Sequence, residues 1–319
     1  MELLQDLLDE AREKEIAEGD KEEEYVSQPR EFLGRVNSWD GFIGNPMAIE
    51  RAKIAIEASI FSGSKMPNVL LYGNAGCGKT TLARIIAGQL NCKLFEITGS
   101  SLRNQLDLVS LVWNIEKAQI DGENVVVFID EIHGMTKGTG LSEDVWLPLL
   151  EDNILHHSCV GKILEKTGDY SAWVVNPSPI RIKPVTWIGA TTDPGLLHEA
   201  IRRRFPISIT LHDYTIDDMR KIITDYVGRE GMFIEVGAID IIASRSRFTP
   251  AIAIHHLLRQ STDIAILDSK DKPKTVITKE HAEKAMRLCE VGEHGLKPED
   301  MAVLKALASV HPKGLGIVT

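Results

Sequence analysis

The sequence predicts an α/β fold with a phosphate-binding loop (P-loop): a doubly wound parallel sheet followed by a small helical lid domain. Apolar runs typical of buried strands alternate with amphipathic helical stretches over residues 68–211. A glycine-rich loop follows the first of these runs and opens a helix. From Tyr214 onward only helical spacing is found, so we expect no further strands there.

The loop reads Gly-Asn-Ala-Gly-Cys-Gly-Lys-Thr over residues 73–80 and fits G-x-x-x-x-G-K-[ST] at every fixed position. An apolar run at 69–72 precedes it and a helical stretch at 81–87 follows. Loop N–H groups and the positive helix end then converge on one point, which suits a polyphosphate. Lys79 can reach the β- and γ-phosphates, and the Thr80 hydroxyl can ligate Mg²⁺. Close backbone approach needs the loop glycines Gly73, Gly76 and Gly78.

A second candidate site follows the apolar run at 125–129, which ends in Asp130 and Glu131. A strand that is apolar on both faces belongs in the middle of a parallel sheet, and ligands bind beyond its carboxyl end. Asp130 can hold Mg²⁺, and Glu131 is placed to orient and deprotonate an attacking water. The alternative is a simple strand end, but together with the loop we favour hydrolysis.

The 319 residues suffice for two or three domains. Of the formal net charge of −10, most lies in residues 1–24, which hold eleven Asp or Glu and three Lys or Arg. We interpret 1–39 as an acidic extension and linker. The remaining chain is nearly neutral, so any DNA contact would use local patches.

No apolar run approaches the roughly 18 residues of a membrane span. The first residues also lack the basic region of a signal peptide. The four cysteines show no C-x-x-C spacing, which argues against zinc and suggests free thiols. We therefore expect a cytoplasmic protein without membrane contact. For Cys77, inside the loop, a space-filling role is favoured over a redox switch.

Apolar periodicity predicts the other elements of the sheet domain. In order these are a helix at 47–61, a strand at 93–98, a helix at 101–119, a helix at 141–152, a long projecting β-hairpin at 153–184, a strand at 185–192, a short helix at 196–204 and a strand at 207–211. Later helices are expected at 215–230, 237–246, 250–268, 278–290 and 298–310.

These motifs resemble those of the AAA+ ATPases, and most closely those of the RuvB-type motors that drive Holliday-junction branch migration. The matching strings follow the family's order: Phe42-Ile43-Gly44, the loop through Lys79-Thr80-Thr81-Leu82-Ala83, Phe128-Ile129-Asp130-Glu131-Ile132-His133, Ile188-Gly189-Ala190-Thr191-Thr192, Ile201-Arg202-Arg203-Arg204-Phe205 and Ser244-Arg245-Ser246-Arg247-Phe248-Thr249-Pro250. The loop and acidic strand alone indicate a P-loop ATPase. The Asp-Glu-Ile-His and Gly-Ala-Thr-Thr strings are more specific to the RuvB-type group.

The resemblance implies ATP and Mg²⁺ as cofactors, with metal contacts from Thr80 and Asp130. Thr192, or alternatively Thr191, resembles the polar sensor near the γ-phosphate. Arg204, with Arg202 as second choice, resembles the arginine finger that reaches a neighbouring subunit's nucleotide, which implies a ring, by analogy a hexamer. The implied nucleotide-binding residues are Ile43, Gly44, Gly73, Gly76, Cys77, Gly78, Lys79, Thr80, Thr81, Tyr214 and Pro250.

Three departures from the family pattern stand out. The lid motif has Ala251 where the family has an arginine that senses the γ-phosphate, and we consider Arg245, Arg247 or Arg259 as substitutes. The hairpin at 153–184, which in the family docks the junction-binding partner RuvA, is longer. The family's DNA-contacting winged-helix domain is nearly absent from the sequence.

The sequence therefore predicts four segments: the extension (1–39), a nucleotide-binding α/β domain (40–212), the lid (213–292), and a linker with the first winged-helix element (293–319). The expected activity is ATP hydrolysis by a ring motor, a helicase acting on branched or double-stranded DNA. The alternative is a nucleotide-dependent switch or assembly factor that binds a protein partner without moving DNA.

Overall fold

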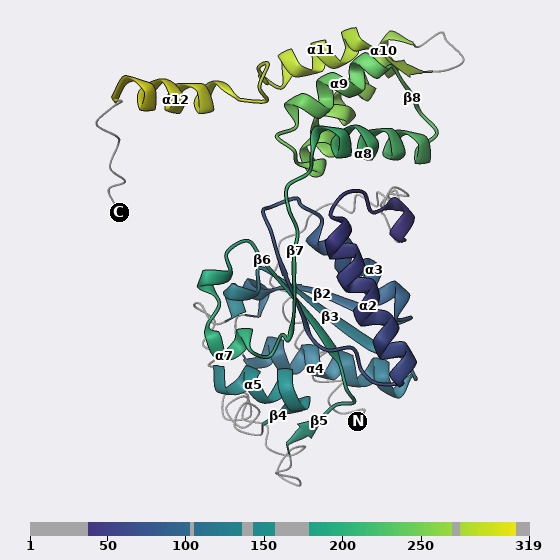
Figure 1. Ribbon diagram of the computed structural model, residues 1–319, viewed down its shortest axis with the longest axis vertical. Coiled ribbons are helices and arrows are strands. Elements are labelled where there is room, and N and C mark those ends of the chain that lie inside the picture. The colour runs from purple at the N-terminus through teal and green to yellow at the C-terminus, as the bar shows by residue number, and fades with distance from the viewer. Residues whose placement is uncertain (1–37, 103–104, 136–142, 157–178, 270–274, 311–319) are drawn as a thin grey trace, which may run out of the picture.

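A five-stranded parallel sheet forms the centre of the larger domain (Figure 1). The structure is a computed structural model that describes residues 38–102, 105–135, 143–156, 179–269 and 275–310. Most of the predicted acidic extension lies outside these ranges. The strand order is β2-β3-β6-β1-β7, with bounds β1 (Val69–Tyr72), β2 (Lys93–Thr98), β3 (Val125–Asp130), β6 (Thr186–Thr191) and β7 (Ile207–Thr210). The predicted doubly wound parallel sheet is confirmed.

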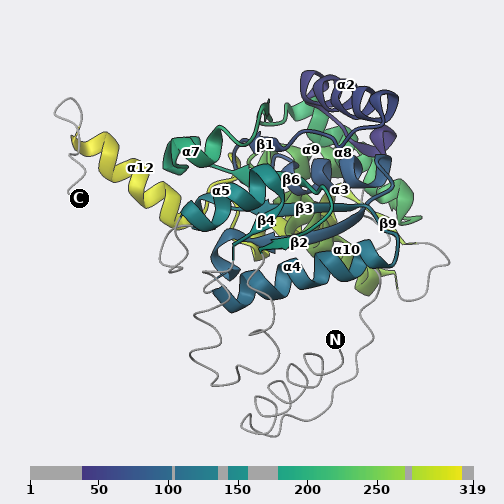
Figure 2. The ribbon, with the colours of Figure 1, turned by 90° about the horizontal axis from the view of Figure 1, so that it is seen from below.

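Helices cover both faces of this sheet. Figure 2 shows α2 (Pro46–Ser62) and α3 (Lys79–Gln89) on one side and α4 (Gln105–Ile120) on the other. The second face is also covered by α5 (Glu143–Asp152), whose Trp146 is fully buried. All six residues of β6 are buried, as are the first five of β3. These two strands therefore occupy the interior of the sheet, as their apolar runs predict.

The parallel order brings three functional segments to one edge. Strands β1, β3 and β6 pair in parallel, so their carboxyl ends emerge together. The glycine-rich loop follows β1, the acid pair ends β3, and Thr191 ends β6. Figure 1 places the smaller domain beyond this edge. A ligand between the two domains would thus lie where ligands bind in open α/β sheets.

Short 3₁₀ turns and small elements complete the larger domain. The turns are η1 (Trp39–Gly41), η2 (Gly99–Ser101), η3 (Ile132–Met135) and η4 (Pro194–Leu196). Strands β4 (Ile154–Leu155) and β5 (Ile180–Arg181) pair antiparallel. They form a base for the predicted hairpin, whose residues 157–178 lie outside the described ranges. The helix predicted at 196–204 is shorter, α7 (Glu199–Arg202), because Leu197 and His198 are extended.

The lid packs around its own apolar core. Its helices are α8 (Ile216–Arg229), α9 (Val236–Arg245), α10 (Arg259–Asp268) and α11 (Lys279–Leu288). The expectation of no strands here was wrong, because β8 (Phe233–Ile234) pairs in parallel with β9 (Val276–Ile277). Two-residue strands are too short to show an alternating pattern, and their partners lie far apart in the sequence.

The helix predicted at 250–268 begins as the π-helix η5 (Ile252–Leu258) and continues as α10. Seven residues of π-helix are unusual, and π-bulges occur mostly at functional sites. Among the described residues, no helix is long and apolar enough to cross a membrane.

The last helix, α12 (Pro298–Val310), extends away from the lid (Figure 1). Residues 301–309 are all exposed, including Met301, Val303, Leu304 and Leu307. Near its start, Asp300 Oδ2 lies 3.3 Å from Arg247 Nη1 of the lid. The linker before α12 packs against the same part of the lid. A Cβ at Gly295 of this linker would lie 2.7 Å from the Arg245 carbonyl oxygen.

Candidate active site

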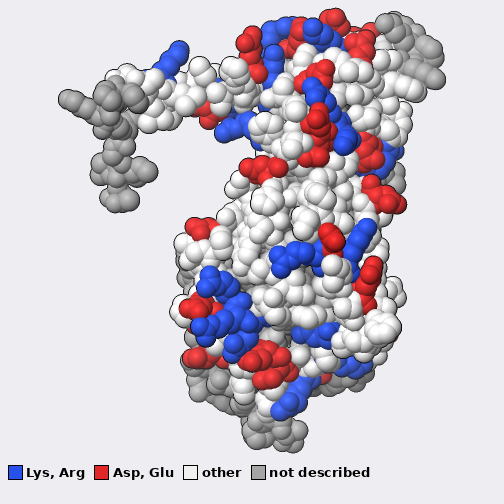
Figure 3. All heavy atoms as spheres, viewed as in Figure 1, with Lys and Arg blue, Asp and Glu red and all other residues white. Residues whose placement is uncertain are grey.

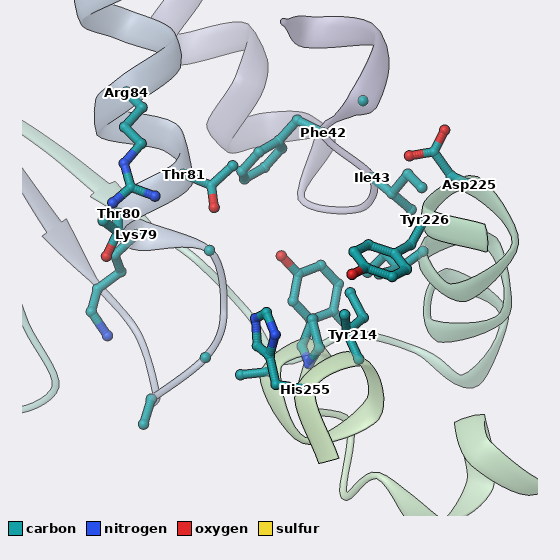
Figure 4. Close-up of a pocket in the computed structure, with 18 of the residues that line it drawn as sticks. Phe42, Ile43, Lys79, Thr80, Thr81, Arg84, Tyr214, Asp225, Tyr226 and His255 are labelled. Atoms are coloured by element: carbon teal, nitrogen blue, oxygen red, sulfur yellow. The ribbon is translucent and has the colours of Figure 1, made fainter. Parts of the chain in front are cut away.

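A cavity of about 620 Å³ lies between the sheet edge and the lid (Figure 4). The larger domain contributes the loop, the start of α3 and the acid pair. The lid contributes residues of α8 and η5. Ten of the residues assigned from sequence line this cavity: Ile43, Gly76, Gly78, Lys79, Thr80, Thr81, Asp130, Glu131, Tyr214 and Pro250. The structure therefore brings most of the predicted site together.

The glycine-rich loop is held in a conformation that only glycine suits. Gly73 has φ +151°, and a Cβ there would lie 2.5 Å from the Leu211 carbonyl oxygen. Gly78 has φ +95°, and its Cβ would lie 2.7 Å from the Tyr214 hydroxyl. Neither position has room for a side chain, so the backbone can curl closely around a ligand. Gly73 does not line the cavity itself; it shapes the turn behind it.

The Lys79 ammonium is kept inside the loop. Lys79 is 7% exposed, and its Nζ donates to the carbonyl oxygens of Gly73 at 2.7 Å and Asn74 at 2.9 Å. A buried ammonium needs such acceptors. Its charge and the loop's backbone curvature suit a phosphate group, and the next two residues, Thr80 and Thr81, carry hydroxyls into the cavity (Figure 4).

Cys77 does not line the cavity. It is 3% exposed and packs in the apolar core beneath the loop. Burial raises the pKa of its thiol, an effect that the Lys79 charge only partly offsets. Redox chemistry needs the thiolate, so the structure favours the space-filling interpretation. The Cys77 carbonyl oxygen has a further role, since it accepts a hydrogen bond of 3.1 Å from the Tyr214 hydroxyl.

The acid pair sits at the end of β3. The Glu131 backbone N–H donates to Asp130 Oδ1 at 3.0 Å, and Glu131 has φ +47°. Such a conformation is uncommon for a residue with a side chain. Gly99 makes it possible, because a Cβ at Gly99 would lie 2.4 Å from the Glu131 carbonyl oxygen. The turn directs the Glu131 side chain into the cavity beside Asp130.

Thr191 and Thr192 have different environments. Thr191 is fully buried, and its hydroxyl contacts the backbone of Asp193 and the ring of His133. Thr192 is exposed just beyond the end of β6. Neither lines the cavity in this state. Thr192 is the threonine whose hydroxyl is not engaged in the core.

The three consecutive arginines begin at the last residue of α7 and lie away from the chain's own cavity. Arg204 Nη2 lies 2.8 Å from Glu151 Oε2, and the Arg204 side chain is 28% exposed. Arg203 pairs with Glu199. Figure 3 shows Lys and Arg side chains gathered where Figure 1 places α7. Since neither Arg202 nor Arg204 lines the cavity, the structure does not bring the predicted finger to the nucleotide site of its own chain.

The opposite side of the cavity is aromatic and apolar. Tyr214, Tyr226 and Ile43 converge there, with Phe42 nearby (Figure 4). Burial raises the pKa of the Tyr214 hydroxyl, so Tyr214 stays neutral and acts as a hydrogen-bond donor. Gly44, which does not line the cavity, lets the Tyr214 ring approach, because its Cβ would lie 3.1 Å from that ring. A flat base could stack in this part of the cavity.

Ala251 lines the cavity but brings no charge to it. The three substitutes considered from sequence do not line it. Arg247 pairs with Asp300, and Arg259 pairs with Asp263 at 3.2 Å. The backbone carbonyl of Arg245 lies against the linker turn at Gly295. The lid residues that bring basic side chains to the cavity are instead Arg229 of α8 and His255 of η5.

Besides Arg229, several residues that sequence reasoning missed lie at or beside the site. Arg84 lines the cavity one turn into α3, held by two 2.6 Å hydrogen bonds to Glu96. Tyr226 and His255 come from the lid. His133 contacts both Glu131 and Thr191. Only His133 had a local signal, its place in the Asp-Glu-Ile-His string.

Comparison with known proteins identifies the family. The model of the Holliday junction DNA helicase RuvB P-loop domain matches residues 35–211. The Holliday junction branch migration complex subunit RuvB of Fervidobacterium nodosum is 34% identical over 273 residues, covering 86% of this chain and 72% of that protein. The RuvB subunit of Corynebacterium jeikeium is 35% identical over 280 residues, with 88% and 72% covered.

Solved structures agree with the sequence matches. The RuvB Holliday junction branch migration motor of Thermotoga maritima superposes with a TM-score of 0.69 at 30% identity, covering 88% of this chain and 80% of that chain. The family model spans more than half of the sequence, and both relatives exceed the identity at which fold and family are shared. The chain therefore belongs to the RuvB family.

Proposed function

We propose that this chain is an ATP-hydrolysing ring motor that acts on branched DNA and drives Holliday-junction branch migration in recombination and repair. The observation that carries the proposal is one cavity that joins a complete phosphate loop to an acid pair, in a chain of the RuvB family. The relatives are branch migration complex subunits, which supports the DNA substrate.

In this proposal ATP lies with its phosphates in the loop and its base against Tyr214 and Ile43. The loop N–H groups and Lys79 Nζ bind the phosphates, exchanging the Gly73 and Asn74 carbonyls for phosphate oxygens. Arg84, whose charge is paired with Glu96, also lines the cavity. Pro250 closes the cavity from the lid.

Thr80 and Asp130 would hold Mg²⁺, which would neutralise charge on the phosphates. Both line the cavity, and hydroxyl and carboxylate oxygens suit this ion. Among the described residues no three His, Cys, Asp or Glu side chains form a metal-binding group. A Mg²⁺ held by few protein ligands plus phosphates fits that arrangement. Glu131 accepts the proton of the attacking water as general base.

Spacing supports two of the assignments. Solved variants of the Thermotoga maritima protein carry single substitutions of an alanine, a threonine, an arginine and a proline, at successive intervals of 2, 12 and 46 residues. The same residue types recur here at the same intervals, as Ala190, Thr192, Arg204 and Pro250. This agreement favours Thr192 over Thr191 as sensor and Arg204 over Arg202 as finger.

The same comparison supports a longer hairpin. Another solved variant substitutes a lysine 92 residues before that alanine. Lys79 precedes Ala190 by 111 residues, so if the two lysines correspond, this chain has 19 extra residues between them. The predicted hairpin with its β4–β5 base lies in this interval. We propose that it docks a RuvA-like junction-binding protein, with an altered contact surface.

Arg204 would act on the nucleotide of the neighbouring subunit, which makes catalysis depend on a ring, by family analogy a hexamer. Its distance from the cavity of its own chain supports a role in trans. The Arg204–Glu151 ion pair of 2.8 Å would have to open, or rotate, for the guanidinium to reach across.

The test is ATP hydrolysis by the purified protein with no DNA, with linear duplex and with a four-way junction, alone and with a RuvA-type protein. We expect hydrolysis that the junction stimulates more than the duplex does, together with ATP-dependent resolution of the junction into its branch products. Hydrolysis that no DNA changes, without movement of the junction, would instead support a nucleotide switch and refute the motor.

A further inference from the structure

One ring nitrogen of His133 contacts two functional segments. His133 Nδ1 lies 3.0 Å from Thr191 Oγ1 and 3.3 Å from Glu131 Oε2. His133 belongs to η3, just after β3, whereas Thr191 ends β6. The ring is largely buried, with 20% of its side chain exposed. A single imidazole therefore bridges the proposed base and the strand end that carries Thr192.

The hydrogen-bond pattern indicates which nitrogen of His133 carries the proton. Thr191 Oγ1 accepts from the Asp193 N–H at 3.1 Å and donates its one hydrogen to the Asp193 carbonyl oxygen at 3.1 Å. It can therefore only accept from His133. The Glu131 carboxylate is also an acceptor. With acceptors at both contacts, we infer that Nδ1 carries the proton.

The Glu131 oxygen that faces His133 depends on this contact. Glu131 Oε2 is a buried atom with no aligned hydrogen bond within the described part of the chain. A buried carboxylate oxygen without a donor is costly. The His133 Nδ1–H lies 3.3 Å from this oxygen and 3.0 Å from Thr191 Oγ1, so its one hydrogen can be shared between the two acceptors.

The backbone around this contact is tightly packed and has little room to move. Gly99 packs against the Glu131 carbonyl, as described above. Ile132, between Glu131 and His133, is fully buried, and a Cβ at Gly189 of β6 would lie 2.4 Å from its Cδ1. The turn from β3 into η3 is thus packed between η2 and β6, so the remaining freedom lies in the Glu131 and His133 side chains.

We propose that His133 is a positioning residue for catalysis: its Nδ1–H orients the Glu131 carboxylate and ties that orientation to the end of β6. This rests on the proposed function, in which Glu131 is the base and Thr192 the sensor. Thr192 follows Thr191 directly, so contact of β6 with the nucleotide and the orientation of the base are joined through one imidazole. His133 binds neither phosphate nor metal in this arrangement.

The test compares three variants in steady-state ATP hydrolysis. His133→Leu removes the donor but keeps much of the volume. His133→Asn keeps an N–H at the place of Nδ1. His294→Asn is the control, an exposed histidine of the lid–α12 linker. We expect His133→Leu to lower kcat about 10-fold, the lower end for one hydrogen bond to a charged group, with KM changed less than about twofold. His133→Asn should recover most of the loss.

A structural role alone would not give this pattern, because a folding defect would lower ATP binding together with kcat. The proposal is overturned if His133→Leu turns over at the wild-type rate, if it loses ATP affinity in proportion to kcat, or if His133→Asn is as slow as His133→Leu.

The protonated nitrogen can be measured separately, from the ¹⁵N shifts of the His133 ring in the nucleotide-free protein. We expect the proton on Nδ1, and a proton on Nε2 alone would refute the contact. This measurement does not depend on turnover. A wild-type protein without any ATPase activity would refute the proposed function, whereas the ring measurement would still decide whether His133 donates to Glu131.

Discussion

The two sides of the cavity differ in how closely they follow the family pattern. On the sheet side, the loop, Lys79, Thr80, Asp130 and Glu131 match at every fixed position and line the cavity together. On the lid side, Ala251 stands where the resemblance predicts an arginine, and η5 is a π-helix.

This difference separates two tasks. Binding and cleaving a polyphosphate depends on groups fixed by the sheet, and these are complete. Moving the lid in response to the γ-phosphate depends on differential contacts between nucleotide states, and the lid's usual charged contact is missing. We therefore expect a normal hydrolytic centre with weak coupling to the lid.

The largest effect is expected from Arg204→Ala, which should bind ATP normally and lose hydrolysis by on the order of 10³-fold or more. The neighbouring Arg203→Ala, which removes only the Glu199 pair, is the matched control. Mixing the Arg204→Ala and Lys79→Ala proteins places an intact finger beside an intact site in some rings, so activity should partly return. Mixed rings that stay inactive would exclude Arg204 as the finger.

Glu131→Gln should slow turnover by about 10²- to 10⁴-fold while ATP still binds, because an amide cannot accept the proton of water. Lys79→Ala should instead lose binding itself, since it removes the ammonium held inside the loop. Lys93→Ala, at an exposed pair with Glu123, is the control for loss of a lysine. Equilibrium nucleotide binding and hydrolysis, measured on the same samples, separate the two outcomes. A Glu131→Gln protein with the original rate shows that the base lies elsewhere.

Ala251→Arg tests the lid side directly. One charge-assisted hydrogen bond contributes about 1.5–3 kcal/mol, or roughly 10- to 150-fold, so the affinity ratio of a non-hydrolysable ATP analogue to ADP should rise by up to that factor. Ala251→Leu adds bulk without charge and should not raise it. An unchanged ratio in Ala251→Arg would indicate that another lid residue already fills the role, with Arg229 and His255 the two basic lid residues at the cavity.

The smallest effect is expected from Tyr214→Phe. The variant loses the hydrogen bond to the Cys77 carbonyl oxygen and leaves that oxygen without its donor. Thermal or urea unfolding should show a loss of about 1 kcal/mol, while ATP affinity changes little because the ring still stacks. A large loss of affinity without loss of stability would mean that the hydroxyl itself contacts the nucleotide.

The sheet, the loop and the acid pair could be predicted because their signals are local. Loop glycines, a buried strand and the residue at its end lie within a few positions of each other, and parallel topology then brings the ends together. The π-helix and the β8–β9 pair could not, since they arise from packing of the lid rather than from periodicity. The bridge from Thr191 through His133 to Glu131 spans separate strands, so its partners become neighbours only in the fold.

The surroundings of Arg204 are a second feature that the sequence does not reveal. Its residue type and place in the sequence suggested a finger, and the spacing of variants in a relative agrees with it. The ion pair with Glu151 was not foreseen, because α5 and α7 are separated by the hairpin and β6. A single chain can show only the intramolecular partner of a residue whose proposed target lies on another subunit.

The β8–β9 pair has a consequence for how the lid folds. It joins residues 233 and 276, with α9, η5 and α10 between them, and gives few hydrogen bonds in return. Closing so long a loop costs conformational entropy before any contact offsets it. We expect the pair to form after the helices have packed, so that Ile277, 1% exposed, becomes buried in the lid core last.

The Glu235 amide donates to the Ile277 carbonyl oxygen at 2.9 Å and therefore reports on the stability of the strand pair. Its hydrogen exchange should be faster than that of the amides inside α9, and slower exchange would show that the strand pair is among the last parts of the lid to open.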